Sequence, residues 1–234
     1  MEITPEATTF SILAIGFALG LQHATEADHL AAVSTIVSEK KNLLTASIVG
    51  GLWGIGHTIS LFAVGMLVIF LKLQISHEVE AKLEACVGAM LIILGLNALR
   101  KLFTASKIHV HSHKHDGREH IHIHTHHNEQ AAVSHHRLTF RSIAVGMVHG
   151  LAGSAALMLL VVPIIESNAV AMLYILIFGI GSIGGMVVMS FLIGLPFHFT
   201  SGRFHLLNRG IRLVACLISL GLGSSIVYQN LLQA

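Results

Sequence analysis

Seven residues near the start of the chain, His23-Ala24-Thr25-Glu26-Ala27-Asp28-His29, carry two imidazoles and two carboxylates. The stretches on either side, 10–21 and 30–37, are almost wholly apolar. An ionisable side chain in such an element costs roughly 2.5–3.5 kcal/mol to insert into a bilayer, so it usually faces a pathway or a site. Imidazole and carboxylate ligands suit a borderline divalent ion such as nickel, cobalt or zinc. We therefore predict that this stretch binds a transition-metal ion in transit.

The spacing of these residues restricts how they can bind. At 100° per residue, one regular helix cannot direct His23, Asp28 and His29 at a single ion. Either the helix unwinds around Ala24–Ala27, or only a subset binds, together with residues from other helices. Glu26 shares a broader face with the two histidines and is a candidate ligand or a partner that orients one. The alternative is a polar cluster that only hydrogen-bonds between helices, although four ionisable groups in seven residues exceed what packing requires.

Two further histidines lie in apolar segments and are weaker candidates. His57, in Gly56-His57-Thr58, is a candidate ligand, or otherwise a residue that satisfies a helix contact. His149 is a candidate ligand, proton relay or exit-path residue. Because imidazole binds a metal only when deprotonated, we expect binding to weaken as the pH falls through the histidine range.

Composition places the chain among membrane proteins. Of its 234 residues, 53% are hydrophobic and 11% are charged. The formal net charge of +2 gives no support for nucleic-acid binding. Cys86 and Cys216 show no Cys-x-x-Cys spacing, so neither a disulfide framework nor a thiolate metal site is expected.

The predicted fold class is an all-α polytopic membrane protein with six transmembrane helices. The apolar segments long enough to span the hydrocarbon are 9–37, 43–72, 83–103, 139–165, 168–197 and 207–230. With the N-terminus outside, every Lys and Arg except Lys72 and Lys82 falls on the inner side. We therefore predict a multi-pass protein of the cell membrane, with both termini extracytoplasmic and the 104–138 loop cytoplasmic.

The two halves of the chain, 1–103 and 139–234, resemble each other. Residues 10–21 align with 140–151, residues 53–57 with 178–182, and residues 94–96 with 220–222, at offsets that nearly agree. Three spans per repeat make the second half enter from the opposite side, which predicts an inverted repeat typical of secondary transporters.

The metal-type residues are not duplicated in this alignment. His23, Asp28 and His29 fall opposite Gly153, Met158 and Leu159, so the first half is expected to hold the ion. Glycines spaced four apart are expected to let helices approach closely; they are Gly16/Gly20, Gly146/Gly150 and Gly181/Gly185.

The 104–138 loop is rich in histidine. The side chains alternate in His-x-His tracts, a compositional signal for metal binding. We expect the loop to capture, buffer or sense metal, and to lack regular structure without it. Its eleven histidines are His109, His111, His113, His115, His120, His122, His124, His126, His127, His135 and His136.

The His-x4-Asp-His pattern of residues 23–29, in Gly20-Leu-Gln-His-Ala-Thr-Glu-Ala-Asp-His29, resembles the signature of the nickel/cobalt transporter family. Trp53-Gly-Ile-Gly-His-Thr58 is similar to that family's Gly-His-Ser/Thr motif. The resemblance implies that His23, Asp28, His29 and His57 recognise the metal, and it is nearest to a shorter, urease-accessory-type branch with six spans. Gln22 stands where the family usually has Arg, and Glu26 where it usually has Asp.

The leading hypothesis is a secondary transporter of Ni²⁺ or Co²⁺, with uptake favoured over efflux by the family branch. The chain has no phosphate-binding Gly-x4-Gly-Lys-Ser/Thr loop, so no ATP hydrolysis is expected. We expect no enzymatic activity and no cofactor, because the ion is cargo. The expected partners are the divalent ion and the lipid bilayer, and a cytoplasmic metallochaperone is a candidate.

Three alternatives stay open. The first is a zinc exporter or a nickel/cobalt exporter. The second is a membrane acyltransferase in which Asp28 would orient His23 as a general base. The third is a thiol-relay electron carrier that would use Cys86 and Cys216.

Overall fold

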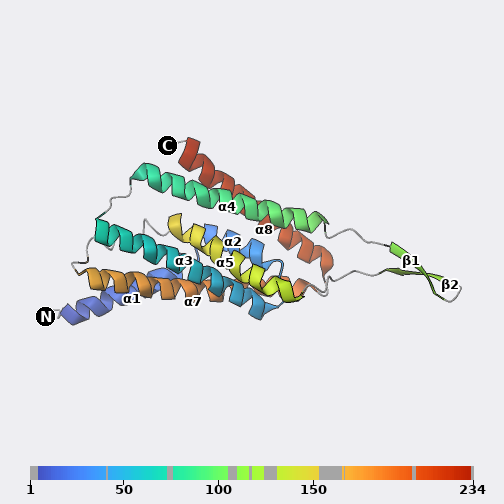
Figure 1. Cartoon of the computed structure of the whole chain (residues 1–234), viewed down its shortest axis with the longest axis horizontal. Helices are drawn as coiled ribbons and strands as arrows, with labels where there is room; N and C mark the ends of the chain where they lie inside the picture. Colours follow the sequence, from blue (N-terminus) through green and yellow to red (C-terminus); the bar gives the residue numbers. More distant parts are fainter. Residues whose placement is uncertain are drawn as a thin grey trace.

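The computed structural model describes residues 5–40, 42–72, 76–104, 110–115, 118–123, 131–152, 165, 167–201 and 204–232. Nearly all of these residues are helical, and the long helices run side by side as a bundle (Figure 1). The helices are α1 (Pro5–His23), α2 (Ala27–Val37), α3 (Leu43–Leu71), α4 (His77–Thr104), α5 (Ala131–Ala152), α7 (Asn168–Ser201) and α8 (His205–Leu232).

Three helices in the described part of the chain are long and apolar enough to cross a membrane, namely α3, α7 and α8. Helices close every backbone hydrogen bond within one segment, which is why they can cross hydrocarbon. The predicted segment 9–37 is divided between the shorter helices α1 and α2. α5 begins at Ala131, well before the predicted start at 139, and residues 153–164 of the predicted fourth segment lie outside the described residues.

Local sequence sets the ends of α3. The side chain of Asn42 accepts a hydrogen bond from the backbone N–H of Leu44, at 2.9 Å, and so caps the first turn. Lys72 ends the helix in a left-handed conformation with φ of 50°. Between them, 29 residues run without a proline or a charged side chain.

The helices pair across the two halves of the chain. α3 packs against both α7 and α5, α7 packs against both α3 and α1, and α4 packs against α8. Glycines permit the close crossings that their spacing predicted. A Cβ at Gly20 would collide with the carbonyl oxygen of Phe178, and one at Gly146 would collide with that of Trp53.

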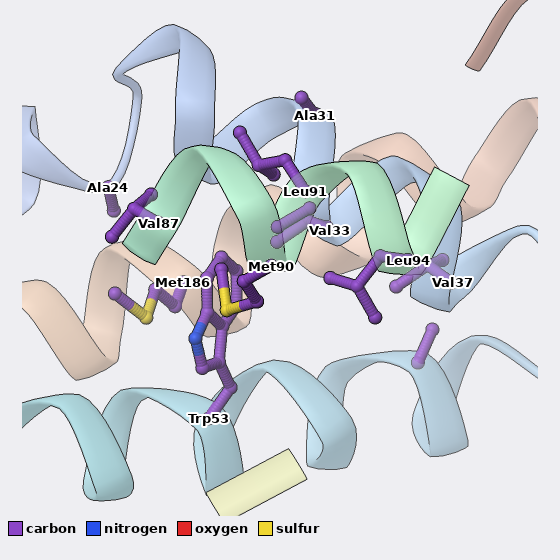
Figure 2. Packing of buried hydrophobic residues seen from close by; sticks show 12 residues of the cluster. Ala24, Ala31, Val33, Val37, Trp53, Val87, Met90, Leu91, Leu94 and Met186 are labelled. Atoms are coloured by element: carbon purple, nitrogen blue, oxygen red, sulfur yellow. The ribbon is translucent and has the colours of Figure 1, made fainter. Parts of the chain in front are cut away.

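A buried apolar cluster joins α2, α3, α4 and α7. Trp53 extends from α3 toward Met90 of α4 and Met186 of α7, and Leu91 of α4 packs in the same cluster with Val33 of α2 (Figure 2). All five side chains are buried, so the cluster fixes α2 between the longer helices. A salt bridge of 2.7 Å between Lys101 and Glu39 links the end of α4 to the end of α2.

The histidine-rich loop differs from our expectation. Strands β1 (Val110–His115) and β2 (Arg118–Ile123) form an antiparallel hairpin that projects from one end of the bundle (Figure 1). His111 pairs with His122, and His113 pairs with His120. The His-x-His alternation has the two-residue period of a strand. His109, His124, His126 and His127 lie outside the described residues.

Candidate metal centre

The helix unwinds where the first motif lies. α1 ends at His23, two turn hydrogen bonds follow (Thr25 N–H to Gln22 O, 2.8 Å; Glu26 N–H to His23 O, 3.1 Å), and α2 begins at Ala27. Glu26 is in an extended conformation, with φ of −65° and ψ of 152°. The break brings the His23 and His29 rings to 4.3 Å between centroids. The helix is thus interrupted at the motif, as in the first of the two arrangements that the spacing allowed.

Four histidines from four helices meet at this break. α3 supplies His57, whose ring lies 5.1 Å from that of His23 and 5.5 Å from that of His29. α5 supplies His149, whose ring lies 4.0 Å from that of His29. All four side chains are fully buried. The structure therefore joins the first motif to both of the weaker histidine candidates.

Asp28 connects two of these imidazoles. Its Oδ1 lies 3.0 Å from His29 Nδ1 and accepts a 2.8 Å hydrogen bond from the His29 backbone N–H. Its Oδ2 lies 2.9 Å from His149 Nε2. A carboxylate can only accept, so the neutral His29 ring donates from Nδ1 and keeps its lone pair on Nε2. His149 likewise donates from Nε2, and its lone pair is on Nδ1.

Several buried nitrogens in the centre have no hydrogen-bond partner within the described part of the chain. They are both ring nitrogens of His23, both of His57, Nε2 of His29 and Nδ1 of His149. Buried polar atoms are nearly always paired in proteins, so such a concentration indicates a ligand site. Neutral imidazole nitrogens are good ligands for nickel, cobalt and zinc.

The ligand atoms fall into two overlapping groups. One atom each from His23, His29 and His57 lie within 4.8 Å of one another, and so do one atom each from Asp28, His29 and His149. Two nitrogens bound to one ion at about 2.1 Å stand roughly 3–3.4 Å apart. Small rotations of the side chains could bring the atoms of either group to such separations.

Glu26 lies at the edge of the centre. Its Oε1 is 3.0 Å from His23 Nδ1, without hydrogen-bond geometry, and its side chain is 39% exposed. All six predicted site residues are thus adjacent, with Glu26 nearest to solvent. By contrast, Asp28 hydrogen-bonds His29 and His149 and not His23, so the dyad that an acyltransferase would need is not formed.

Trp53 also contacts the centre, although the sequence analysis assigned it no role. Its ring stacks on that of His29, with centroids 5.5 Å apart and planes at 29°, and it lies edge-on to His149 at 5.4 Å. Trp53 precedes His57 by four residues on α3, so the two share a helix face. That spacing was the available signal. The indole therefore packs between the centre's histidines and the apolar cluster to which it belongs.

Comparisons with known proteins find relatives of this chain. The chain is 39% identical over 204 residues to the urease accessory protein UreH of Bacillus sp. (strain TB-90), covering 87% of this chain and 85% of that protein. It is 23% identical to the Chloroplast protein FOR GROWTH AND FERTILITY 2 of Arabidopsis thaliana, covering 91% of this chain and 55% of that protein. It is 28% identical to a protein described as a candidate nickel/cobalt efflux system of Methanocaldococcus jannaschii, covering 74% and 72%.

No solved structure matches the chain. The family model described as NicO, high-affinity nickel-transport protein, matches residues 9–233, which is nearly the whole chain. The interrupted helix, the buried histidines and this match lead to one conclusion: the chain belongs to the NicO family of nickel-transport proteins.

Proposed function

We propose that this protein is a secondary transporter that carries Ni²⁺ or Co²⁺ across the cell membrane, with the ion held by His23, His29 and His57. The observation that carries the proposal is the set of unpartnered nitrogens on these three buried rings. Leaving a buried polar atom unpaired costs about 1–3 kcal/mol. A cation that binds these nitrogens offsets that cost. Membership of the NicO family supports nickel or cobalt as the cargo.

In this proposal Asp28 positions ligands and does not bind the ion itself. Both of its oxygens already accept hydrogen bonds from imidazoles. A carboxylate behind a metal-binding histidine fixes the ring tautomer and raises its basicity. His149, on the other oxygen of Asp28, completes this support, and its Nδ1 has no hydrogen-bond partner among the described residues.

We further propose six spans arranged as two inverted repeats, with α1 and α2 together forming the first span. The packing supports this arrangement because it is nearly the same when the halves are exchanged. If α1 and α2 together correspond to α5, α3 to α7 and α4 to α8, then the contact of α3 with α5 corresponds to that of α7 with α1. The contact of α2 with α8 likewise corresponds to that of α5 with α4. An interrupted helix that carries the ion site between such repeats is a recurrent transporter architecture.

The proposed orientation places both termini outside and the hairpin in the cytoplasm. The two chain ends lie at one end of the bundle and the hairpin lies at the other (Figure 1), which is consistent with the Lys and Arg distribution. Uptake is the proposed direction. Export is a second candidate, because a relative described as an efflux system is 28% identical to the chain.

The test uses the full-length chain in sealed vesicles, with its eleven loop histidines replaced by asparagine so that they cannot mask the centre. Replacement of His23, His29 or His57 by Ala should abolish ⁶³Ni²⁺ transport and high-affinity binding. His77→Ala is the matched control, because that imidazole is fully exposed at the start of α4. Transport that survives all three replacements contradicts the proposal. Comparing right-side-out with everted vesicles separates uptake from export.

A further inference from the structure

The metal centre is enclosed by protein on most sides. Its four imidazoles are fully buried, whereas the side chains of Asp28 and Glu26 are 18% and 39% exposed. Those two carboxylates line a cavity of about 280 Å³ beside the α1–α2 break. We call this cavity the acidic chamber; its lining residues are Glu26, Ala27, Asp28, Glu84, Val87, Leu222 and Ile226.

The chamber is built to attract a cation. Its polar lining consists of three carboxylates, those of Glu26, Asp28 and Glu84, and no Lys or Arg is among the lining residues. The remaining walls are aliphatic, and low-dielectric walls concentrate the field of such charges. Within the described residues, no ion pair involves the half-buried Glu84, and Lys82, two residues before it, is paired with Glu78 at 2.6 Å. The volume accommodates a divalent ion that keeps its water shell.

A fully buried and unpartnered side chain links the chamber to the centre. His23 is 0% exposed and neither ring nitrogen has a hydrogen-bond partner in the described part of the chain, yet its Nδ1 lies 3.0 Å from Glu26 Oε1. On the neighbouring side, Asp28 reaches from the chamber to His29 and His149. Two carboxylates therefore stand between the cavity and the free imidazole nitrogens.

We infer that the acidic chamber is the access route by which a hydrated divalent transition-metal ion reaches the imidazoles, and that Glu84 is the residue that captures it. Glu84 lies on α4, which supplies no ligand to the centre. The ion exchanges water for the Glu84 and Glu26 oxygens in the chamber, and then for the nitrogens of His23, His29 and His57. Asp28, whose oxygens contact His29 and His149, contributes its charge. This inference rests on the proposed transport function. With the N-terminus outside, the chamber opens to the extracytoplasmic side.

Glu84→Gln tests the role of the Glu84 charge in capturing the ion. In vesicles, the KM for Ni²⁺ uptake should rise about three- to tenfold, and the dependence of uptake on ionic strength should flatten, because less of the attracting field remains. Equilibrium Ni²⁺ binding to the solubilised protein should stay within about twofold of the parent, and Glu84→Asp should restore uptake. The matched control is Glu80→Gln, which removes one charge from the same end of α4 but does not line the chamber.

The outcomes distinguish a failure of the chamber inference from a failure of the proposed transport function. If Glu84→Gln and Glu80→Gln have the same kinetics while His29→Ala abolishes transport, the chamber inference is overturned and the proposed function stands. If Glu84→Gln abolishes equilibrium binding, Glu84 belongs to the centre or the fold and is not an access residue, so the inference again fails. If His29→Ala transports normally, the proposed function itself fails.

A second measurement does not depend on transport. In a full-length Cys86→Ser, Cys216→Ser background, Ala27→Cys places one thiol in the chamber wall. A membrane-impermeant thiol reagent added outside intact cells should modify it, and Ni²⁺ should slow the reaction. Modification only from the cytoplasmic side, or a rate that Ni²⁺ leaves unchanged, overturns the inference.

Discussion

Asp28, which the sequence predicts to be a metal ligand, contacts two imidazoles. Its oxygens lie 3.0 Å from His29 Nδ1 and 2.9 Å from His149 Nε2. The two candidate groups of ligand atoms, one with Asp28 and one without it, therefore predict different effects of replacing Asp28. If His23, His29 and His57 hold the ion, Asp28 acts through His29 alone.

Asp28→Asn distinguishes these cases. Asparagine keeps the shape but replaces one acceptor with an N–H₂ donor, so one of the two histidines loses its partner. Removing such a supporting carboxylate costs about 10–100-fold in metal affinity. We expect Ni²⁺ binding to the solubilised protein, measured calorimetrically in the asparagine-loop background, to weaken by that factor while the thermal midpoint stays near that of the parent.

Complete loss of binding in Asp28→Asn, equal to that of His29→Ala, would instead make Asp28 a direct ligand. Glu80→Gln is a suitable reference, because its carboxylate stands at the exposed start of α4. It removes the same charge without touching the centre, and its affinity should equal that of the parent.

At the scale of elements, the crossing of α1 and α7 depends on a glycine. A Cβ at Gly20 would collide with the carbonyl oxygen of Phe178 and stand 2.9 Å from the backbone nitrogen of Ser182. Both obstacles are backbone atoms, so the helices must separate to admit a methyl group. His23 follows Gly20 by less than one turn, and such a separation also displaces its ring from the centre.

Gly20→Ala should therefore destabilise the protein by about 1–3 kcal/mol, the usual cost of overpacking. For a chain of this length the thermal midpoint would fall by about 2–4 °C per kcal/mol. Gly221→Ala is the matched control, since a Cβ there meets nothing within 4 Å. That variant should have an unchanged or slightly higher midpoint. Equal midpoints for the two variants would show that the α1–α7 crossing tolerates separation.

The elements also show how far the sequence could predict the site. The helix break was one of two arrangements that geometry allowed, because one regular helix cannot direct His23, Asp28 and His29 together at one ion. The contact between Asp28 and His149 could not be predicted in the same way, since it joins residues 121 positions apart. It depends on how α5 is rotated and how deep it sits, which packing against α3 determines. Glu84 could not be predicted from the sequence for the same reason, because only the placement of α4 brings it beside the break.

For the whole molecule, the crosswise packing of the two halves has a mechanical consequence. α3 and α7 pair at the centre and each also holds the first helix of the other half, so neither half can move without shifting a wall of the site. The first half carries three of the four histidines, and α5 of the second half carries His149. A displacement of α5 would therefore pull on His149, and through Asp28 on His29, which couples movement of the halves to the geometry of the site.

The last prediction is that the acidic chamber and the hairpin face opposite sides of the membrane. The chain ends share one end of the bundle, and the hairpin projects from the other (Figure 1). A tag fused at either terminus should bind antibody on intact spheroplasts. A cysteine replacing Ser112 of the hairpin, in the Cys86→Ser, Cys216→Ser background, should react with an impermeant reagent only after permeabilisation. If the hairpin is labelled on intact cells and the tags are hidden, the chamber faces the cytoplasm, and the access route inferred above is overturned.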